Sequence, residues 1–209
     1  MLTRRILADN DALIKVAYCD LVEESKHVLG GEMFKLPTFS PWLRRRVAKG
    51  ACSESIAKHV ETTVTQCIDR LSEPDLNIME QLQPIAGLDP GEITLLASAA
   101  NSDSSIVFTG DKRCIRALAD GVPSVASLLA GKIWTVEQVI LGTIDQHGFS
   151  YVSEKVCRSF NGDISIDTAI STAFSYGVEP SEGECVACLT AYVEELRDAT
   201  GSLLASPTK

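Results

Sequence analysis

The sequence predicts an α/β fold in which a mostly parallel sheet lies between helices on both faces, a three-layer α/β/α arrangement. Short apolar runs, typical of buried strands, alternate along the chain with longer segments whose apolar residues recur at helical spacing. The composition is that of a globular protein, with 45% hydrophobic and 22% charged residues among 209. This length is sufficient for one sizeable domain with a helical appendage.

The N-terminal half of the chain contains two expected strands and three expected helices. The first strand is an apolar run that ends at Asp9, and the glycine pair Gly30 and Gly31 separates the following helix from the second strand. The longest helical pattern of the chain comes after the second strand, with apolar residues every three or four positions. In chain order, we expect a strand at 5–8, a helix at 12–24, a strand at 34–36, and helices at 51–71 and 78–82.

The clearest local signal of the chain lies at residues 88–100. Asp89 suits an N-cap, Pro90 suits the first helical position, and Glu92 stands where a capping box has its acid. We therefore expect an α/β domain over residues 1–130 and a helical C-terminal extension over 131–209 that ends in a flexible tail. The remaining expected elements are a buried strand at 105–109 and helices from 112, at 125–129, at 136–147 and at 185–200.

The chain is acidic, with 19 Lys and Arg against 28 Asp and Glu and a net charge of −9. This balance argues against a protein that coats nucleic acid and against a polybasic membrane binder, since both need excess positive charge. The charge is uneven, because residues 1–60 hold 10 basic and 7 acidic side chains. An anionic partner could therefore still dock on the N-terminal part.

Other features of the sequence indicate a cytoplasmic protein with no membrane partner. No apolar run approaches the roughly 18–20 residues that span a bilayer, and two acids precede any signal-peptide apolar region. The seven cysteines are scattered, without the spacing of a disulfide framework. Cys185 and Cys188 have metal-knuckle spacing but no second ligand pair, so we expect them to be packed small residues of a helix.

Three acids are expected to meet at one edge of the sheet. Asp9 follows the first strand and Asp111 lies just past strand 105–109, so both reach the carboxyl edge. Glu92 starts the helix before that strand. About ten helical residues lead the chain roughly 15 Å away from the carboxyl edge, and five strand residues bring it back by roughly 16 Å. Glu92 and Asp111 are therefore expected to lie close together. Three adjacent carboxylates repel one another unless a cation is bound. Oxygen ligands without clustered His or Cys favour Mg²⁺ or Mn²⁺, which could assist phosphodiester cleavage.

Each of these acids also has a simpler structural explanation. Asp9 would cap the helix after it, Glu92 would complete a capping box, and Asp111 would be a turn residue. Their joint placement favours a metal site, and geometry alone leaves both explanations open.

The dense basic cluster of the chain is Arg44, Arg45 and Arg46 with Lys49, and Trp42 stands beside it. Arginine binds phosphate bidentately, and tryptophan stacks on RNA bases. The same residues would equally suit a solvated helix face with a partly buried tryptophan.

Three segments of the chain, taken together, resemble the acidic motifs of PIN-domain ribonucleases. They are residues 7–14 (LADNDALI), 88–92 (LDPGE) and 107–113 (VFTGDKR), followed by GVPSV at 121–125. Each motif alone is weakly specific, and their order and spacing over about residues 5–155 carry the resemblance. The resemblance implies a PIN-like domain at residues 1–130.

The resemblance also implies a function, a metal and partners. Asp9, Glu92 and Asp111 would hold Mg²⁺ or Mn²⁺ in a ribonuclease that hydrolyses single-stranded RNA. A second copy of the chain or a cognate protein is a further expected partner. Thr109 would line the site, and Lys112 or Arg113 would meet a phosphate. With the basic cluster included, the candidate substrate-binding residues are Arg44, Arg45, Thr109, Lys112 and Arg113.

The chain departs from the family pattern at one position. The family usually supplies another acid from the helix after the second strand, but residues 36–43 (LPTFSPWL) contain none. Trp42 or Leu43 stands where a Glu is expected, and Glu32, Glu54 or Glu61 could compensate. A catalytically degenerate PIN-like module that binds RNA or a protein is therefore the alternative.

A different enzyme class is the less favoured alternative. Asp9-Asn10-Asp11 also resembles the Asp-x-Asp pair of haloacid dehalogenase-like phosphatases, in which Asp9 would carry the phosphoryl group covalently. Thr109, Lys132 and the segment 162–167 would follow in that family's order. Residues 160–161 do not form the apolar strand that this last motif requires.

Overall fold

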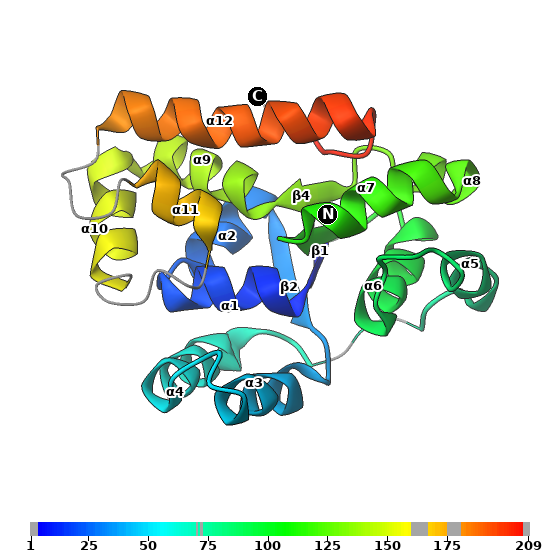
Figure 1. Cartoon of the computed structure of the whole chain (residues 1–209), viewed down its shortest axis with the longest axis horizontal. Coiled ribbons are helices and arrows are strands. Elements are labelled where there is room, and N and C mark those ends of the chain that lie inside the picture. The colour runs from blue at the N-terminus through cyan, green and yellow to red at the C-terminus, as the bar shows by residue number, and fades with distance from the viewer. Residues whose placement is uncertain (1–3, 70, 72, 160–166, 175–180, 207–209) are drawn as a thin grey trace.

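The computed structural model describes residues 4–69, 71, 73–159, 167–174 and 181–206. It shows an α/β fold with one four-stranded sheet and helices on both sides (Figure 1). The strands are β1 Arg4–Ala8, β2 Gly31–Lys35, β3 Ser105–Thr109 and β4 Ile133–Thr135. The α-helices are α1 Asn10–Tyr18, α2 Val22–Leu29, α3 Phe39–Ala48, α4 Glu54–Thr63, α5 Leu76–Leu82, α6 Pro90–Ala100, α7 Lys112–Gly121, α8 Pro123–Leu128, α9 Val136–His147, α10 Phe149–Ser159, α11 Thr168–Ala173 and α12 Glu182–Thr200.

The sheet is parallel throughout, with the strand order β2-β1-β3-β4. β1 is an inner strand, in which Ala8 is paired with Lys35 on one side and with Phe108 on the other. Each outer strand carries one further parallel bridge, to Ile68 beside β2 and to Leu204 beside β4. All four strands therefore end at the same edge of the sheet, where parallel α/β proteins place their sites.

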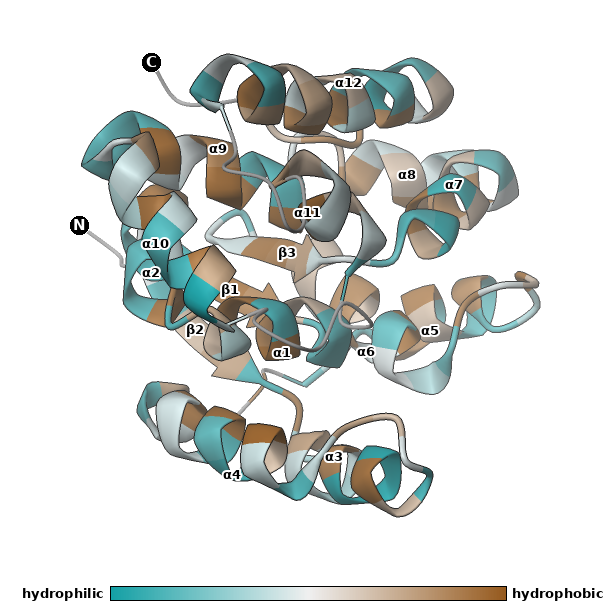
Figure 2. Ribbon diagram, turned by 60° about the vertical axis from the view of Figure 1, so that its left-hand side comes forward, coloured by the Kyte–Doolittle hydropathy of each residue, from teal (hydrophilic) through white to brown (hydrophobic). Residues whose placement is uncertain are grey.

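Each face of the sheet has its own apolar core, because successive strand residues point to opposite faces. Ile6 and Ala8 pack in a core with α1–α4 and α9–α11, and Leu7 packs on the other face with α5–α8. Figure 2 shows β1 and β3 as apolar strands between these helices. α12 contributes to both cores; Cys185 and Cys188 pack in the first, as predicted. The α/β/α layering predicted from the sequence is confirmed.

Local sequence signals fix several element boundaries. Asp89 Oδ1 accepts a hydrogen bond from Glu92 N at 2.9 Å, and Glu92 Oε2 accepts one from Asp89 N at 2.7 Å. This capping box begins α6 as predicted. α9 and β3 have the predicted bounds, and a second capping box between Thr135 and Gln138 begins α9.

Two helices are shorter than their apolar patterns predict. The helix expected at 12–24 is divided into α1 and α2, where Asp20 takes a left-handed backbone conformation with a φ of 53°. The segment 51–71 is α-helical only over Glu54–Thr63, because a 3-10 turn follows and Ile68 then pairs with β2. The prediction that this segment holds the longest helix is wrong: α12, with 19 residues, is longer. Among the described helices, none is long and apolar enough to cross a membrane.

β4 is a strand that the sequence pattern did not predict. It lies beyond residue 130, within the segment expected to be a helical extension. Ile133 pairs with Val107 of β3 and bridges Leu204 on its other side. Both apolar cores also contain residues from either side of residue 130. The sheet therefore includes part of the segment that was assigned to the extension.

Candidate active site

Asp9, Glu92 and Asp111 line one cavity of about 470 Å³ at the carboxyl edge of the sheet. Asp9 directly follows β1, Asp111 lies two residues after β3, and Glu92 belongs to the first turn of α6. The three acids that the sequence analysis selected thus line one cavity. The other charged or aromatic residues of the cavity are Asp11, Trp42, Arg45, Arg46, Asp89 and Arg113.

Asp9 is a buried carboxyl group, only 9% exposed. Burial, and next the charge of Asp11, raises its pKa to about 7. The nearby backbone N–H groups of Asn10 and Asp11 oppose this shift, but the side chain makes no capping hydrogen bond to α1. Thr109 Oγ1 lies 3.5 Å from Asp9 Oδ2 and accepts a hydrogen bond from Asp111 N at 3.1 Å. Helix capping therefore does not explain Asp9, and Thr109 links it to the turn after β3.

Glu92 caps helix α6 and also lies among the acids of the cavity. One carboxylate oxygen completes the capping box of α6. Burial, together with the charges of Asp89, Asp111 and Asp9, raises the pKa of Glu92 to about 7. Glu92 therefore belongs electrostatically to the acid cluster while it also begins the helix.

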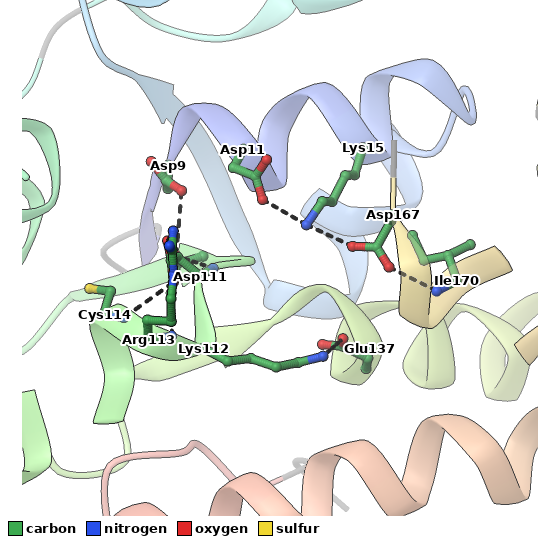
Figure 3. A network of polar contacts seen from close by, with 11 residues as sticks. Asp9, Asp11, Lys15, Asp111, Lys112, Arg113, Cys114, Glu137, Asp167 and Ile170 are labelled. Carbon is green, nitrogen blue, oxygen red and sulfur yellow. Dashed lines mark hydrogen bonds and ion pairs between the residues drawn. The ribbon is translucent and has the colours of Figure 1, made fainter. Parts of the chain in front are cut away.

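Asp111 differs from the other two acids because its charge is already compensated. Its Oδ1 accepts hydrogen bonds from the backbone N–H of Arg113 at 2.8 Å and of Cys114 at 3.2 Å, which caps α7. The Arg113 guanidinium pairs with the same carboxylate, with Nη2 2.8 Å from Oδ2 (Figure 3). Burial alone would raise the pKa of Asp111, but these hydrogen bonds, led by that of the Arg113 side chain, hold it below its ordinary value.

A divalent cation fits the chemistry of these donors. Buried carboxyl groups whose charged forms are disfavoured by burial and by neighbouring acids are stabilised when a cation binds them. In the described ranges, no three His, Cys, Asp or Glu side chains are grouped closely enough to hold a metal by themselves. Mg²⁺ commonly uses one or two carboxylates and keeps several waters, so Asp9 and Glu92 could hold it in that way. Asn10, 8% exposed, adds a buried Oδ1 without a hydrogen-bond partner beside this cavity.

Arginines bring positive charge to the same cavity. Arg45 and Arg46 come from α3 and Arg113 from the start of α7. The Arg46 guanidinium lies 5.1 Å from the ring centre of Trp42, which also lines the cavity. Of the predicted basic cluster, Arg45 and Arg46 line the cavity and Arg44 does not; Arg46 belonged to that cluster but not to the residues selected for substrate binding. Its spacing of four residues from Trp42 places both on one side of a helix and is the signal that could have identified it.

Lys112 does not line this cavity, although the sequence analysis considered it for phosphate binding. Its Nζ pairs with Glu137 Oε1 at 2.7 Å and lies 4.4 Å from the ring centre of Tyr192. Glu137 is 3% exposed. The ammonium group therefore points toward α9 and α12 (Figure 3), where it compensates a buried carboxylate.

A buried ion-pair chain that the sequence analysis missed lies beside the acids. Lys15, 6% exposed, pairs with Asp11 at 2.6 Å and with Asp167 at 2.7 Å (Figure 3). A Cβ atom on Gly110 would lie 2.8 Å from Lys15 Nζ. The absence of a side chain at Gly110 thus lets the ion pair pack against the turn that carries Asp111.

The phosphatase-like motif can be placed only in part. Gly162 and Asp163 lie outside the described residues. Asp167 is described and pairs with Lys15. Lys132 precedes β4 and donates to three backbone carbonyl oxygens near the end of α6, each at 3.3 Å. These contacts hold Lys132 at the amino end of β4, away from the edge that carries Asp9.

The chain has no match among models of known protein families, among curated proteins or among solved structures. In the cavity of this chain, buried carboxylates, arginines and a tryptophan lie at the carboxyl edge of a parallel sheet.

Proposed function

We propose that the chain is a PIN-like ribonuclease that hydrolyses single-stranded RNA with Mg²⁺ or Mn²⁺. The observation that carries this proposal is one cavity lined both by Asp9, Glu92 and Asp111 and by the arginines of α3 and α7. Carboxylates bind hard divalent cations, and guanidinium groups bind phosphate bidentately. The cavity is therefore complementary to a phosphodiester accompanied by a cation. The three PIN-like segments of the sequence support the same family.

The residues of the cavity would have different roles in the reaction. Asp9 and Glu92 would lose their protons and hold the cation, since a nearby positive charge favours their ionised forms. Asp111 would be the third carboxylate facing the cation in the same cavity. When bound, Mg²⁺ or Mn²⁺ would supply charge stabilisation at the phosphoryl group and favour ionisation of an attacking water. The Thr109 hydroxyl donates a hydrogen bond to Asp9 and accepts one from the Asp111 backbone, and so links these two acids. Arg45, with Arg46, would orient the phosphates of the RNA.

Trp42 and Arg46 favour a single-stranded substrate. The guanidinium carbon of Arg46 lies over the Trp42 ring, and both of these planar groups line the cavity. An unpaired base can stack on such a group, whereas a base inside a duplex is already stacked. With a net charge of −9, the chain would engage RNA through these few local contacts.

Cleavage of single-stranded RNA in the presence of Mn²⁺ tests the proposal. We expect Asp9→Asn and Asp111→Asn each to lower the rate by about 100-fold or more, the scale seen when a transition-state contact is removed. Lys132→Gln, at the other end of the sheet, should retain the wild-type rate. Activity that persists in both aspartate variants would exclude this cavity as the catalytic site.

A PIN-like module that binds RNA without cleaving it is the second candidate. The observation in its favour is that Arg113 already neutralises Asp111, while residues 36–43 supply no acid. The arginines and Trp42 would then bind single-stranded RNA or a cognate protein. A chain that neither cleaves RNA nor binds Mn²⁺ in calorimetry would favour this candidate.

A further inference from the structure

We infer that Arg113 is an exchangeable partner that covers Asp111 in the free site and leaves it for a phosphate of the substrate. The exchange would release one carboxylate oxygen of Asp111 to the divalent cation. Phosphate and cation would then promote each other's binding. This inference rests on the proposed function and adds to it a control of metal binding by the substrate.

The two oxygens of Asp111 have different surroundings. Oδ1 accepts the backbone N–H of Arg113 and of Cys114, at 2.8 and 3.2 Å, and thus belongs to the cap of α7. The Arg113 side chain contacts both oxygens, with Nε donating to Oδ1 at 3.3 Å and Nη2 to Oδ2 at 2.8 Å, and it is the partner of Oδ2. Arg113 therefore covers the oxygen that the helix cap leaves free for a cation.

Arg113 can leave this position without disturbing the fold. Its side chain is 86% exposed, and exposed ion pairs contribute little to stability. The backbone hydrogen bonds to Oδ1 would keep the Asp111 carboxylate in place after Arg113 moved. A change of partner would thus involve one flexible side chain.

A phosphate group is a suitable new partner for Arg113. The side chain lines the same cavity as Asp9 and Glu92, and guanidinium groups bind phosphate through two parallel hydrogen bonds. A cation that binds Asp111 Oδ2 would favour the released Arg113, and a phosphate that binds Arg113 would favour the cation. Such coupling is reciprocal in free energy.

Calorimetric titration of the full chain with Mn²⁺ tests this exchange without reference to activity. We expect Arg113→Gln to bind Mn²⁺ alone about two- to fivefold more tightly than wild type, the range of an exposed ion pair. Arg45→Gln is the matched control, because it removes the same charge from the same cavity, and in the described part of the chain the ion-pair partner of Asp111 is Arg113 rather than Arg45. Arg116→Gln, on α7 but paired with Glu195 outside the cavity, should leave Mn²⁺ affinity unchanged.

A second titration includes sulfate, a tetrahedral anion that cannot be cleaved here, at constant ionic strength. Sulfate should tighten Mn²⁺ binding to wild type, and this effect should be lost in Arg113→Gln. The exchange is excluded if Mn²⁺ binds but Arg113→Gln gains no more affinity than Arg45→Gln, or if sulfate acts equally on wild type and Arg113→Gln. If no form of the chain binds Mn²⁺, the proposed function itself fails, together with the exchange.

Discussion

At the scale of single residues, the three site carboxylates differ in how their charge is compensated. Asp111 has Arg113 as its partner, whereas Asp9 and Glu92 take part in no ion pair among the described residues. Burial and the neighbouring acids then raise the pKa of Asp9 and of Glu92 to about 7. A bound cation would therefore change the protonation of these two residues most.

The affinity for Mn²⁺ should rise with pH between about pH 6 and pH 8. Binding requires that Asp9 and Glu92 lose their protons, and each displaced proton changes the affinity by about tenfold per pH unit below its pKa. Calorimetry in buffers of different ionisation enthalpy would count the protons released. Asp9→Asn should release fewer protons, and a pH-independent affinity would contradict this assignment.

The same pKa shifts predict how the metal-free chain responds to pH. Because the pKa of Asp9 and Glu92 is raised on folding, the folded chain binds more protons than the unfolded chain between about pH 4 and pH 7. This contribution to stability is full at lower pH and is lost as pH rises through about 7. Mn²⁺ should therefore raise the melting temperature more at pH 8 than at pH 5.5, and an equal rise would count against a site at these residues.

Lys112→Gln should destabilise the fold and leave RNA binding unchanged. The substitution leaves Glu137, which is 3% exposed, without its cation. Loss of one partner of a buried pair costs about 3–5 kcal/mol, and the partial exposure of Lys112 reduces the expected cost to about 1–3 kcal/mol. Urea unfolding measures this change. The double variant Lys112→Gln/Glu137→Gln should recover part of the lost unfolding free energy. If a normally folded Lys112→Gln chain binds RNA more weakly than wild type, Lys112 takes part in RNA binding after all.

At the scale of elements, sequence reasoning succeeds where a local signal sets a boundary. The capping box at Asp89 fixes the start of α6, and the ends of β1 and β3 place Asp9 and Asp111 at one edge. Sequence reasoning fails where an element boundary depends on a contact between residues far apart in the chain. β4 has three residues, too few for a periodic pattern, and the break at Asp20 lies inside an apolar pattern that continues across it.

The candidate site shows the same division between local and distant information. The three acids lie at the ends of neighbouring elements, so their placement in one cavity at the sheet edge could be predicted. The pairing of Lys15 with Asp167 joins segments far apart in the chain and leaves no local pattern. Which arginines of α3 reach the cavity depends on the orientation of that helix over the sheet edge, and the sequence does not specify this orientation.

The turn between β3 and α7 should tolerate a side chain at Gly110 only at a cost in stability. A Cβ atom there would lie 2.8 Å from Lys15 Nζ and 3.0 Å from Asp11 Oδ2. Both contacted atoms are the ends of side chains, so the Lys15–Asp11 pair should shift, at the lower end of the roughly 1–3 kcal/mol that overpacking costs. The altered charges beside the cavity should also weaken Mn²⁺ binding. Gly183→Ala is the matched control, because no atom lies within 4 Å of its added Cβ. Thermal melting and Mn²⁺ titration measure both effects, and a Gly110→Ala chain that matches the control in both would show that the ion pair moves aside without cost to either.

At the scale of the whole molecule, the C-terminal part completes the fold. Ile133 pairs with β3, Leu204 bridges β4, and α12 spans both apolar cores. In Figure 1, α12 crosses above β4 and α9. Residues 134–209 hold 11 acidic and 4 basic side chains, and this part of the chain supplies α9 and α12, which cover the sheet. The arginines of the cavity come instead from α3 and α7.

A fragment of residues 1–130 should fail to fold as a cooperative unit. Truncation there removes β4 and α12, and with them Trp134, Leu196 and Leu203, which are 5%, 0% and 2% exposed. The edge of β3 would lose its neighbour, and Val107 and Phe108 would lose packing partners in opposite cores. Unpaired strand edges and exposed apolar faces favour aggregation. Circular dichroism and urea unfolding of the fragment against the full chain measure this. A sharp transition with a native-like slope would instead show that residues 1–130 fold alone, because that slope reports the surface that unfolding exposes.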